Sequence, residues 1–222
     1  MARLGLDFTV VTSGVDETAE AFDQPADLAL ELSRRKALAV APSQPDALVI
    51  GSDTIVVIDG TVLGKPADER DAARMLRTLR GRTHQVITGV AVVDTVTGRC
   101  RARAATTAVT MRAFGDDELA AYIASGEPFD KAGSYAIQGR GGALVERIDG
   151  PFDNVVGLPA AVVVDLLREF GHDIADNTAG GPANSAADGT VDGLVDGLVD
   201  GMVDKTADVE GTRMRAPSTR TR

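Results

Sequence analysis

The chain has 222 residues, 44% of them hydrophobic and 25% charged, the proportions of an ordinary globular protein. Its formal net charge of −10 argues against a protein that binds nucleic acid, because such proteins neutralise phosphates with a broad basic surface. A single cysteine, Cys100, excludes an internal disulfide and a multi-cysteine metal site, and no apolar run approaches the roughly 20 residues that cross a bilayer.

The first residues, Met1 to Gly5, do not contain an apolar stretch long enough for the core of a signal peptide. We therefore expect a cytoplasmic protein with neither a membrane nor a nucleic acid as its partner.

Helix-like and strand-like patterns alternate over the first three quarters of the chain. In chain order they predict a helix over 25–41, strands over 47–50, 55–58 and 61–63, a helix between Asp68 and Gly81, strands over 86–93 and 101–111, a helix over 116–125, a strand over 144–148 and a helix over 159–170. Proline or aspartate precedes the helices and glycine follows most of them. This order favours a three-layer α/β domain with a partly antiparallel sheet.

Composition changes near Ile174. All eight aromatic residues precede it, and residues 175–222 contain a repeat of Val-Asp-Gly with Leu or Met between Val191 and Met202. Glycine at every fourth position costs about 1 kcal/mol each in a helix, and the composition is that of unstructured segments. We predict a folded domain over 1–174 and a low-complexity, disordered tail over 175–222.

Polar residues interrupt one apolar run. Gly51-Ser52-Asp53-Thr54 separates two β-branched segments, and a buried carboxylate there needs a cation, a metal or water as its partner. One interpretation is a turn or bulge in which Asp53 accepts backbone hydrogen bonds. The other is a general base or metal ligand at a strand end that faces a cleft.

Two lysines are placed unusually. Leu28, Leu32, Lys36 and Val40 are four residues apart, so Lys36 rises from an apolar row of the predicted helix. Such lysines often extend past the edge of a core to reach water. Lys65 follows a predicted hairpin in Gly-Lys-Pro, where a solvated turn lysine is the simpler interpretation. The chain has only four lysines, which makes their presence in these segments suggestive.

A glycine-rich loop over 127–142 permits close approach of backbone to a ligand, but the chain has no P-loop or dinucleotide fingerprint. With only His84 and His172, the sequence has no histidine-rich metal site. A divalent ion would be held by carboxylates, phosphates and water, which suits Mg²⁺ or Mn²⁺.

Eight segments together resemble the Maf family of nucleoside triphosphate pyrophosphatases. They are, in order, Leu4–Phe8 (LGLDF), Val15–Glu17 (VDE), Lys36-Ala37, Gly51–Thr54 (GSDT), Leu63–Pro66 (LGKP), Gly81–Val90 (GRTHQVITGV), Lys131–Gly139 (KAGSYAIQG) and Asn154–Pro159 (NVVGLP). The match runs from about Leu4 to Gly171. Each segment alone is weak, whereas eight in sequence are specific.

The resemblance implies a three-layer α/β fold with a mixed, twisted sheet and a deep cleft between two lobes. It also implies hydrolysis of a nucleoside triphosphate to the monophosphate and pyrophosphate, which keeps non-standard nucleotides out of nucleic acids, with a possible role in the arrest of cell division. A divalent cation, Mg²⁺ or Mn²⁺, and a homodimer belong to the same expectation.

By the same resemblance, Asp53 would accept the proton of the attacking water, and Glu17, Lys36 and Lys65 would complete the catalytic set. Asp53 and Glu17 would hold the metal. Thr54 and Gln138 match positions associated with substrate choice in the branch that prefers dTTP and UTP.

One family feature is missing. Members usually begin with a strand and a loop that reads roughly Ala-Ser-x-Ser-Pro-Arg-Arg, and this chain starts after that point. The expectation is a start assigned too late or, if the loss is real, an unfilled gap beside the central strands.

Two alternatives remain open at this stage. One is a catalytically weak, nucleotide-binding regulatory protein that lacks the phosphate loop. The other is a partner-binding module that uses the acidic repeat and the basic end of the tail.

Overall fold

The computed structural model describes residues 4–17, 22–174 and 212–215. Its seven described strands form one sheet in the order β1-β7-β2-β4-β5-β6, with β3 paired to β2. The strands are β1 (Phe8–Val10), β2 (Ala47–Ile58), β3 (Thr61–Leu63), β4 (Thr83–Asp94), β5 (Cys100–Met111), β6 (Val145–Asp149) and β7 (Thr212–Arg215). The α-helices are α1 (Pro25–Val40), α2 (Glu69–Leu79), α3 (Asp116–Ala124), α4 (Phe152–Val156) and α5 (Ala160–Glu169). Short 3₁₀ turns lie at Ala41–Ser43, Glu127–Asp130, Ala132–Ser134 and Gly139–Leu144.

Three long strands, β2, β4 and β5, form the centre of the sheet. The β4 strand pairs with both of the others, and every described strand pairing is antiparallel. The α/β class is confirmed, but the parallel pairs expected of a mixed sheet do not occur among the described strands. The β2–β3 and β4–β5 connections are short turns, which can join only antiparallel neighbours.

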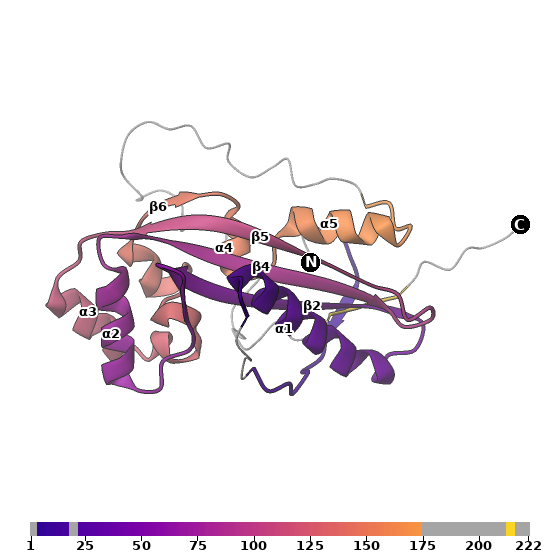
Figure 1. Cartoon of the computed structure of the whole chain (residues 1–222), viewed down its shortest axis with the longest axis horizontal. Coiled ribbons are helices and arrows are strands. Elements are labelled where there is room, and N and C mark those ends of the chain that lie inside the picture. The colour runs from indigo at the N-terminus through magenta and orange to yellow at the C-terminus, as the bar shows by residue number, and fades with distance from the viewer. Residues whose placement is uncertain (1–3, 18–21, 175–211, 216–222) are drawn as a thin grey trace, which may run out of the picture.

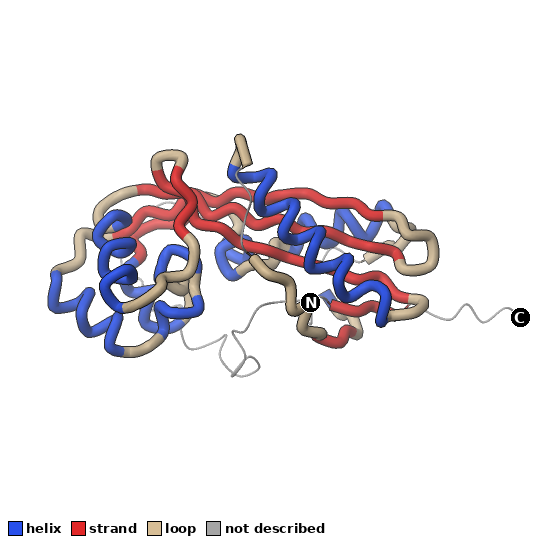
Figure 2. Tube along the Cα trace, turned by 60° about the horizontal axis from the view of Figure 1, so that its bottom comes forward, coloured by secondary structure: helices blue, strands red, loops and turns tan. Residues whose placement is uncertain are grey.

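Helices pack on both faces of this sheet, so that the domain has three layers (Figure 1). Strand residues alternate between the faces. On β2, Val49, Ile55 and Val57 contact the α1 side, whereas Leu48 and Ile50 pack in one cluster with α5 residues. The long helix that crosses the central strands in Figure 2 is α1.

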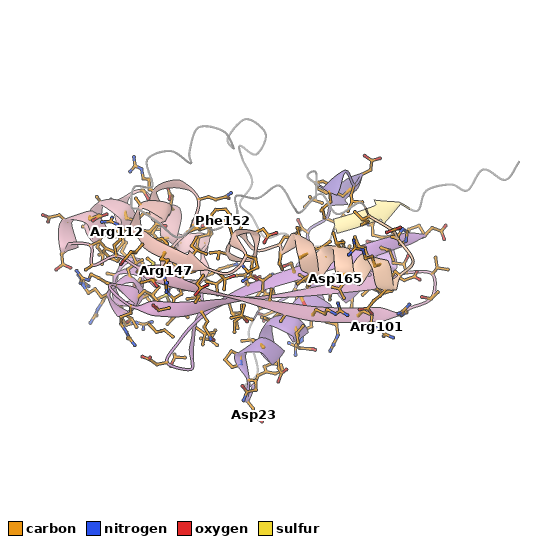
Figure 3. All side chains as sticks on the ribbon, turned by 90° about the horizontal axis from the view of Figure 1, so that it is seen from above. Asp23, Arg101, Arg112, Arg147, Phe152 and Asp165 are labelled. Atoms are coloured by element: carbon orange, nitrogen blue, oxygen red, sulfur yellow. The ribbon has the colours of Figure 1, made fainter. Side chains whose placement is uncertain are left out.

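A separate apolar cluster lies at one end of the sheet, where α2 and α3 gather (Figures 1 and 2). It contains Met75 and Leu76 of α2, Leu119 of α3 and the β2 residues Val56 and Ile58. Figure 3 marks the two ends of the domain, with Arg112 and Arg147 at this end and Arg101 and Asp165 at the other. The apolar core is thus divided into clusters along one continuous sheet, and the deep cleft between two lobes stays a prediction.

The start of the α2 helix shows how closely the local sequence matches the structure. Asp68 is its N-cap, and the Asp68 carboxylate accepts a hydrogen bond of 2.7 Å from the Asp71 backbone N–H. The preceding Asp59-Gly60 turn has positive φ at both residues, 50° and 74°, as a two-residue hairpin requires.

The four described residues of the tail form β7. This strand lies between β1 and β2, and pairs Phe8–Val10 on one side and Ala47–Ile50 on the other. Residues 212–215 thus add a strand beside the long strand β2. For residues 212–215 the structure therefore differs from the expected disorder, while residues 175–211 and 216–222 lie outside the described part of the chain.

Within the described ranges, none of the helices has the length and apolar character required to span a membrane.

Candidate active site

Four charged side chains from distant parts of the chain meet in one cluster. The Lys36 Nζ lies 2.7 Å from Glu17 Oε1 and 2.8 Å from Asp53 Oδ1, and the Lys65 Nζ lies 3.1 Å from Glu17 Oε2. The structure thus brings together all four residues predicted as the catalytic set. We refer to Glu17, Lys36, Asp53 and Lys65 as the charged cluster.

Close packing of α1 on the sheet brings Lys36 to Asp53. A Cβ atom at Gly51 would lie 2.3 Å from the Ser33 carbonyl oxygen, and one at Gly89 would lie 2.2 Å from the Ala29 carbonyl oxygen. Both contacts are with the backbone of α1, so only glycine allows the helix to approach this closely. Lys36 is only 4% exposed as a result, and its ammonium group ends among carboxylates rather than in solvent.

Asp53 does not lie at a turn, a bulge or a strand end. The β2 strand is continuous from Ala47 to Ile58, and Asp53 pairs with Gly89 of β4 in its middle. Both sequence interpretations of the break were wrong on this point, because the Lys36 ammonium satisfies the buried carboxylate while the backbone ladder continues.

Strand pairing along one edge of β2 is interrupted around Asp53. On that edge β7 pairs with residues 47–50 and β3 pairs with residues 56–58, so no described strand pairs with residues 51–55. Most of this unpaired stretch is buried, and Asp53 itself is 8% exposed.

The electrostatics of the charged cluster follow from burial and ion pairing. Burial raises the pKa of Asp53 above its ordinary value, although the Lys36 ammonium opposes the change. Burial also acts to lower the pKa of Lys36, but Asp53 and Glu17 outweigh it and raise the value to about 12. For Glu17, the ion pairs with Lys36 and Lys65 overcome the effect of burial and lower its pKa. Lys36 is therefore a fixed positive charge at neutral pH, whereas Asp53 is a more basic carboxylate than usual.

Thr54, a predicted substrate-binding residue, lies on the opposite face of β2 from Asp53. Its Oγ1 is 2.9 Å from Thr88 Oγ1, and Thr88 Oγ1 donates to the Asn154 carbonyl oxygen at 2.8 Å. A carbonyl oxygen only accepts, so Thr88 uses its single proton there and Thr54 must donate to Thr88. The remaining lone pairs make the Thr54 hydroxyl an acceptor only.

Gln138, the other predicted substrate-binding residue, is exposed at the start of the Gly139–Leu144 turn. Its loop reaches the charged cluster through the backbone, because the Gly133 N–H donates to the carbonyl oxygen of Gly64 at 3.0 Å, next to Lys65. Gln138 is thus on a loop attached to the cluster, and its contact with a substrate stays a prediction.

Sequence reasoning missed the packing role of Gly51 and Gly89. Both glycines lie in segments that carry the family resemblance, GSDT and GRTHQVITGV. A glycine inside a strand-like run is itself a signal of close backbone approach. It also missed Tyr122 and Glu127, which hold the Gln138 loop, because nothing in the local pattern around them shows which loop they contact.

Comparison with known proteins places these residues in a family context. A family model described as "Maf-like protein" matches residues 1–170. Among similar proteins, each named dTTP/UTP pyrophosphatase, that of Moorella thermoacetica is 52% identical over 174 residues, covering 78% of this chain and 90% of its own. That of Pelotomaculum thermopropionicum is 47% identical over 174 residues, covering 78% and 91%. That of Geobacter sulfurreducens is 47% identical over 171 residues, covering 77% and 90%.

Proposed function

The chain belongs to the family of Maf-like proteins, and we propose that it is a nucleoside triphosphate pyrophosphatase that acts on dTTP and UTP. It hydrolyses the triphosphate to the nucleoside monophosphate and pyrophosphate. The observation that carries this proposal is the charged cluster, in which a buried carboxylate and two ammonium groups meet beside the segment of β2 that lacks a described strand partner on one edge. The names of the similar proteins supply the substrate class.

Asp53 is the proton acceptor in this proposal. Attack of water on the α-phosphorus requires a group that orients the water and takes up its proton. Burial raises the pKa of Asp53, which makes it a stronger base than an exposed aspartate. It lies between the segments of β2 that pair with β7 and β3, and its side chain is 8% exposed.

The lysines stabilise negative charge. Charge builds on the phosphoryl oxygens and on the departing pyrophosphate during the reaction, and fixed cations nearby lower the barrier. Lys36 stays protonated because its pKa is raised to about 12, so it acts as a charge and not as an acid or base. Lys65 is 41% exposed and is the ammonium group that an incoming phosphate can reach most directly.

Glu17 and Asp53 would hold a divalent cation. The charged cluster contains two positive and two negative groups, so a triphosphate brings an excess of negative charge that a cation would offset. No group of three or more metal-ligating side chains occurs among the described residues, so phosphate and water oxygens would complete the coordination. These hard oxygen donors fit Mg²⁺ or Mn²⁺, which commonly retain waters and bind phosphates. When bound, the ion would neutralise phosphate charge and polarise the phosphoryl group.

The test is pyrophosphate release from dTTP and UTP, with Mg²⁺ or Mn²⁺, by the wild-type protein and by Asp53→Asn. We expect the variant to bind dTTP while its turnover falls by about 10²–10⁴-fold, the usual contribution of a general base. A panel of canonical and modified nucleoside triphosphates identifies the preferred substrate. Near-normal turnover in Asp53→Asn would refute the role of Asp53.

The same assay separates the alternative function, a nucleotide-binding regulatory protein. A wild-type protein that binds UTP but releases no pyrophosphate with either metal would favour that alternative. From the family resemblance we also propose that the protein is a cytoplasmic homodimer. Light scattering of the purified protein checks the oligomeric state.

A further inference from the structure

The loop that carries Gln138 is hydrogen-bonded on both sides of that residue. Two positions before it, the Ala136 N–H donates to the Tyr122 hydroxyl at 3.1 Å. Two positions after it, the Arg140 N–H donates to the Glu127 carboxylate at 3.1 Å. The backbone on either side of Gln138 is therefore held by two side chains, Tyr122 of α3 and Glu127 at the start of the loop.

Tyr122 holds the first side from within the core. It is 4% exposed on α3, and burial raises its pKa to about 12, so the hydroxyl is neutral at physiological pH. The loop folds tightly over this hydroxyl, because a Cβ atom at Gly141 would lie 2.6 Å from it. A side chain at that position would push the loop away from Tyr122.

Glu127 holds the second side through charge. Its carboxylate also accepts a longer bond of 3.4 Å from the Gly141 N–H, so two successive backbone donors point at one anion. Gly139 adopts a φ of +78°, and a Cβ atom there would lie 3.1 Å from Glu127 Oε2. The turn after Gln138 therefore closes around this carboxylate, and hydrogen bonds to a charged acceptor are stronger than neutral ones.

The same loop is attached to the charged cluster at its other end. The Gly133 N–H bonds to the Gly64 carbonyl oxygen, which immediately precedes Lys65. Gly133 also packs against Val56 of β2, where a Cβ atom would lie 2.9 Å from the valine side chain. The position of Gln138 relative to Lys65 and β2 thus depends on contacts at Gly133, Ala136 and Arg140.

We propose that Tyr122 and Glu127 are positioning residues that hold Gln138 where it contacts the nucleotide. The proposal rests on the proposed function and on the prediction, from the family resemblance, that Gln138 contacts the substrate. Neither side chain needs to touch the nucleotide. Each acts by fixing the backbone two residues from Gln138.

The test compares Tyr122→Phe, which removes only the hydroxyl, with Glu127→Ala and Glu127→Gln. We expect each of Tyr122→Phe and Glu127→Ala to raise the KM for dTTP by about 10-fold to about 100-fold, because a displaced binding group weakens contact with the substrate. The kcat should change by less than about twofold. Glu127→Gln retains an oxygen acceptor and should recover part of the loss. Glu146→Ala removes an exposed carboxylate on β6 and is the matched control, with an unchanged KM.

A double-mutant cycle with Gln138→Ala decides whether the effect passes through Gln138. In the Gln138→Ala background, Tyr122→Phe and Glu127→Ala should produce no further rise in KM. Additive effects, or a Gln138→Ala variant with wild-type KM, overturn the proposal. The same cycle is repeated in the Asp53→Asn background, with the affinity for dTTP measured by calorimetry in the absence of turnover. Failure of the positioning role of Tyr122 and Glu127 is then distinguishable from failure of the proposed hydrolysis.

Discussion

Replacement of Gly51 by alanine should separate α1 from the sheet and disturb the charged cluster. The added Cβ would lie 2.3 Å from the Ser33 carbonyl oxygen and 2.7 Å from the Ala37 backbone nitrogen. Because both atoms belong to the helix backbone, no side-chain rotation relieves the overlap. The helix must move by about 1 Å to reach ordinary van der Waals contact.

Two effects follow from this displacement. Overpacking of a well-packed core typically costs about 1–3 kcal/mol in the free energy of unfolding. The contact between Lys36 Nζ and Asp53 Oδ1, now 2.8 Å, lengthens as Lys36 moves with the helix. A misplacement of about 1 Å in a catalytic group can lower turnover on the order of 100-fold.

Urea denaturation and pyrophosphate release from dTTP measure the two effects separately. Gly115→Ala is the control, because a Cβ there meets no atom within 4 Å and the residue lies far from the cluster in sequence. As Gly115 is the N-cap of α3, the control should lose no more than about 1 kcal/mol and no turnover. Wild-type stability and turnover in Gly51→Ala would refute the close-packing argument. Lost stability with full turnover would show that Lys36 keeps its position without the close approach of α1 to the sheet.

Two further predictions concern stability. Burial lowers the pKa of His84 from its ordinary value of 6.5 to about 4. As the pH falls, His84 is therefore protonated in the unfolded chain before it is protonated in the folded chain. The free energy of unfolding should fall by about 3 kcal/mol as the pH drops from 6.5 toward 4. Urea titrations across that range check the slope, which should become shallower in His84→Gln; an unchanged slope would exclude His84 as its source. Removal of residues 212–222 takes β7 from between β1 and β2, and should destabilise the domain by about 1 kcal/mol for each backbone hydrogen bond lost. Thermal unfolding of the truncated chain measures this loss, and an unchanged midpoint would contradict a structural role for β7.

The local sequence determined most of the elements and the identity of the charged residues. Proline at the start of α1, aspartate at the start of α2 and the Asp59-Gly60 turn all act through neighbouring backbone, so their effects could be predicted residue by residue. Asp53 and Lys36 could be selected because each interrupts an apolar pattern, a local signal of a polar group that needs a partner. The family resemblance supplied Glu17 and Gln138, which no local pattern distinguishes.

Only the tertiary structure decided how these residues meet. The sequence suggested a break in the strand at Asp53, but the Lys36 ammonium satisfies the carboxylate and the strand continues. Thr54 and Asp53 are adjacent in the chain and point to opposite faces, because side chains alternate along a strand. The pairing of β7 joins residues more than 150 positions apart in the chain, and nothing in its own four residues specifies the strand beside which it lies. Ion pairs, helix approach and strand pairing are contacts between distant segments, so their outcome depends on the whole fold and not on any segment alone.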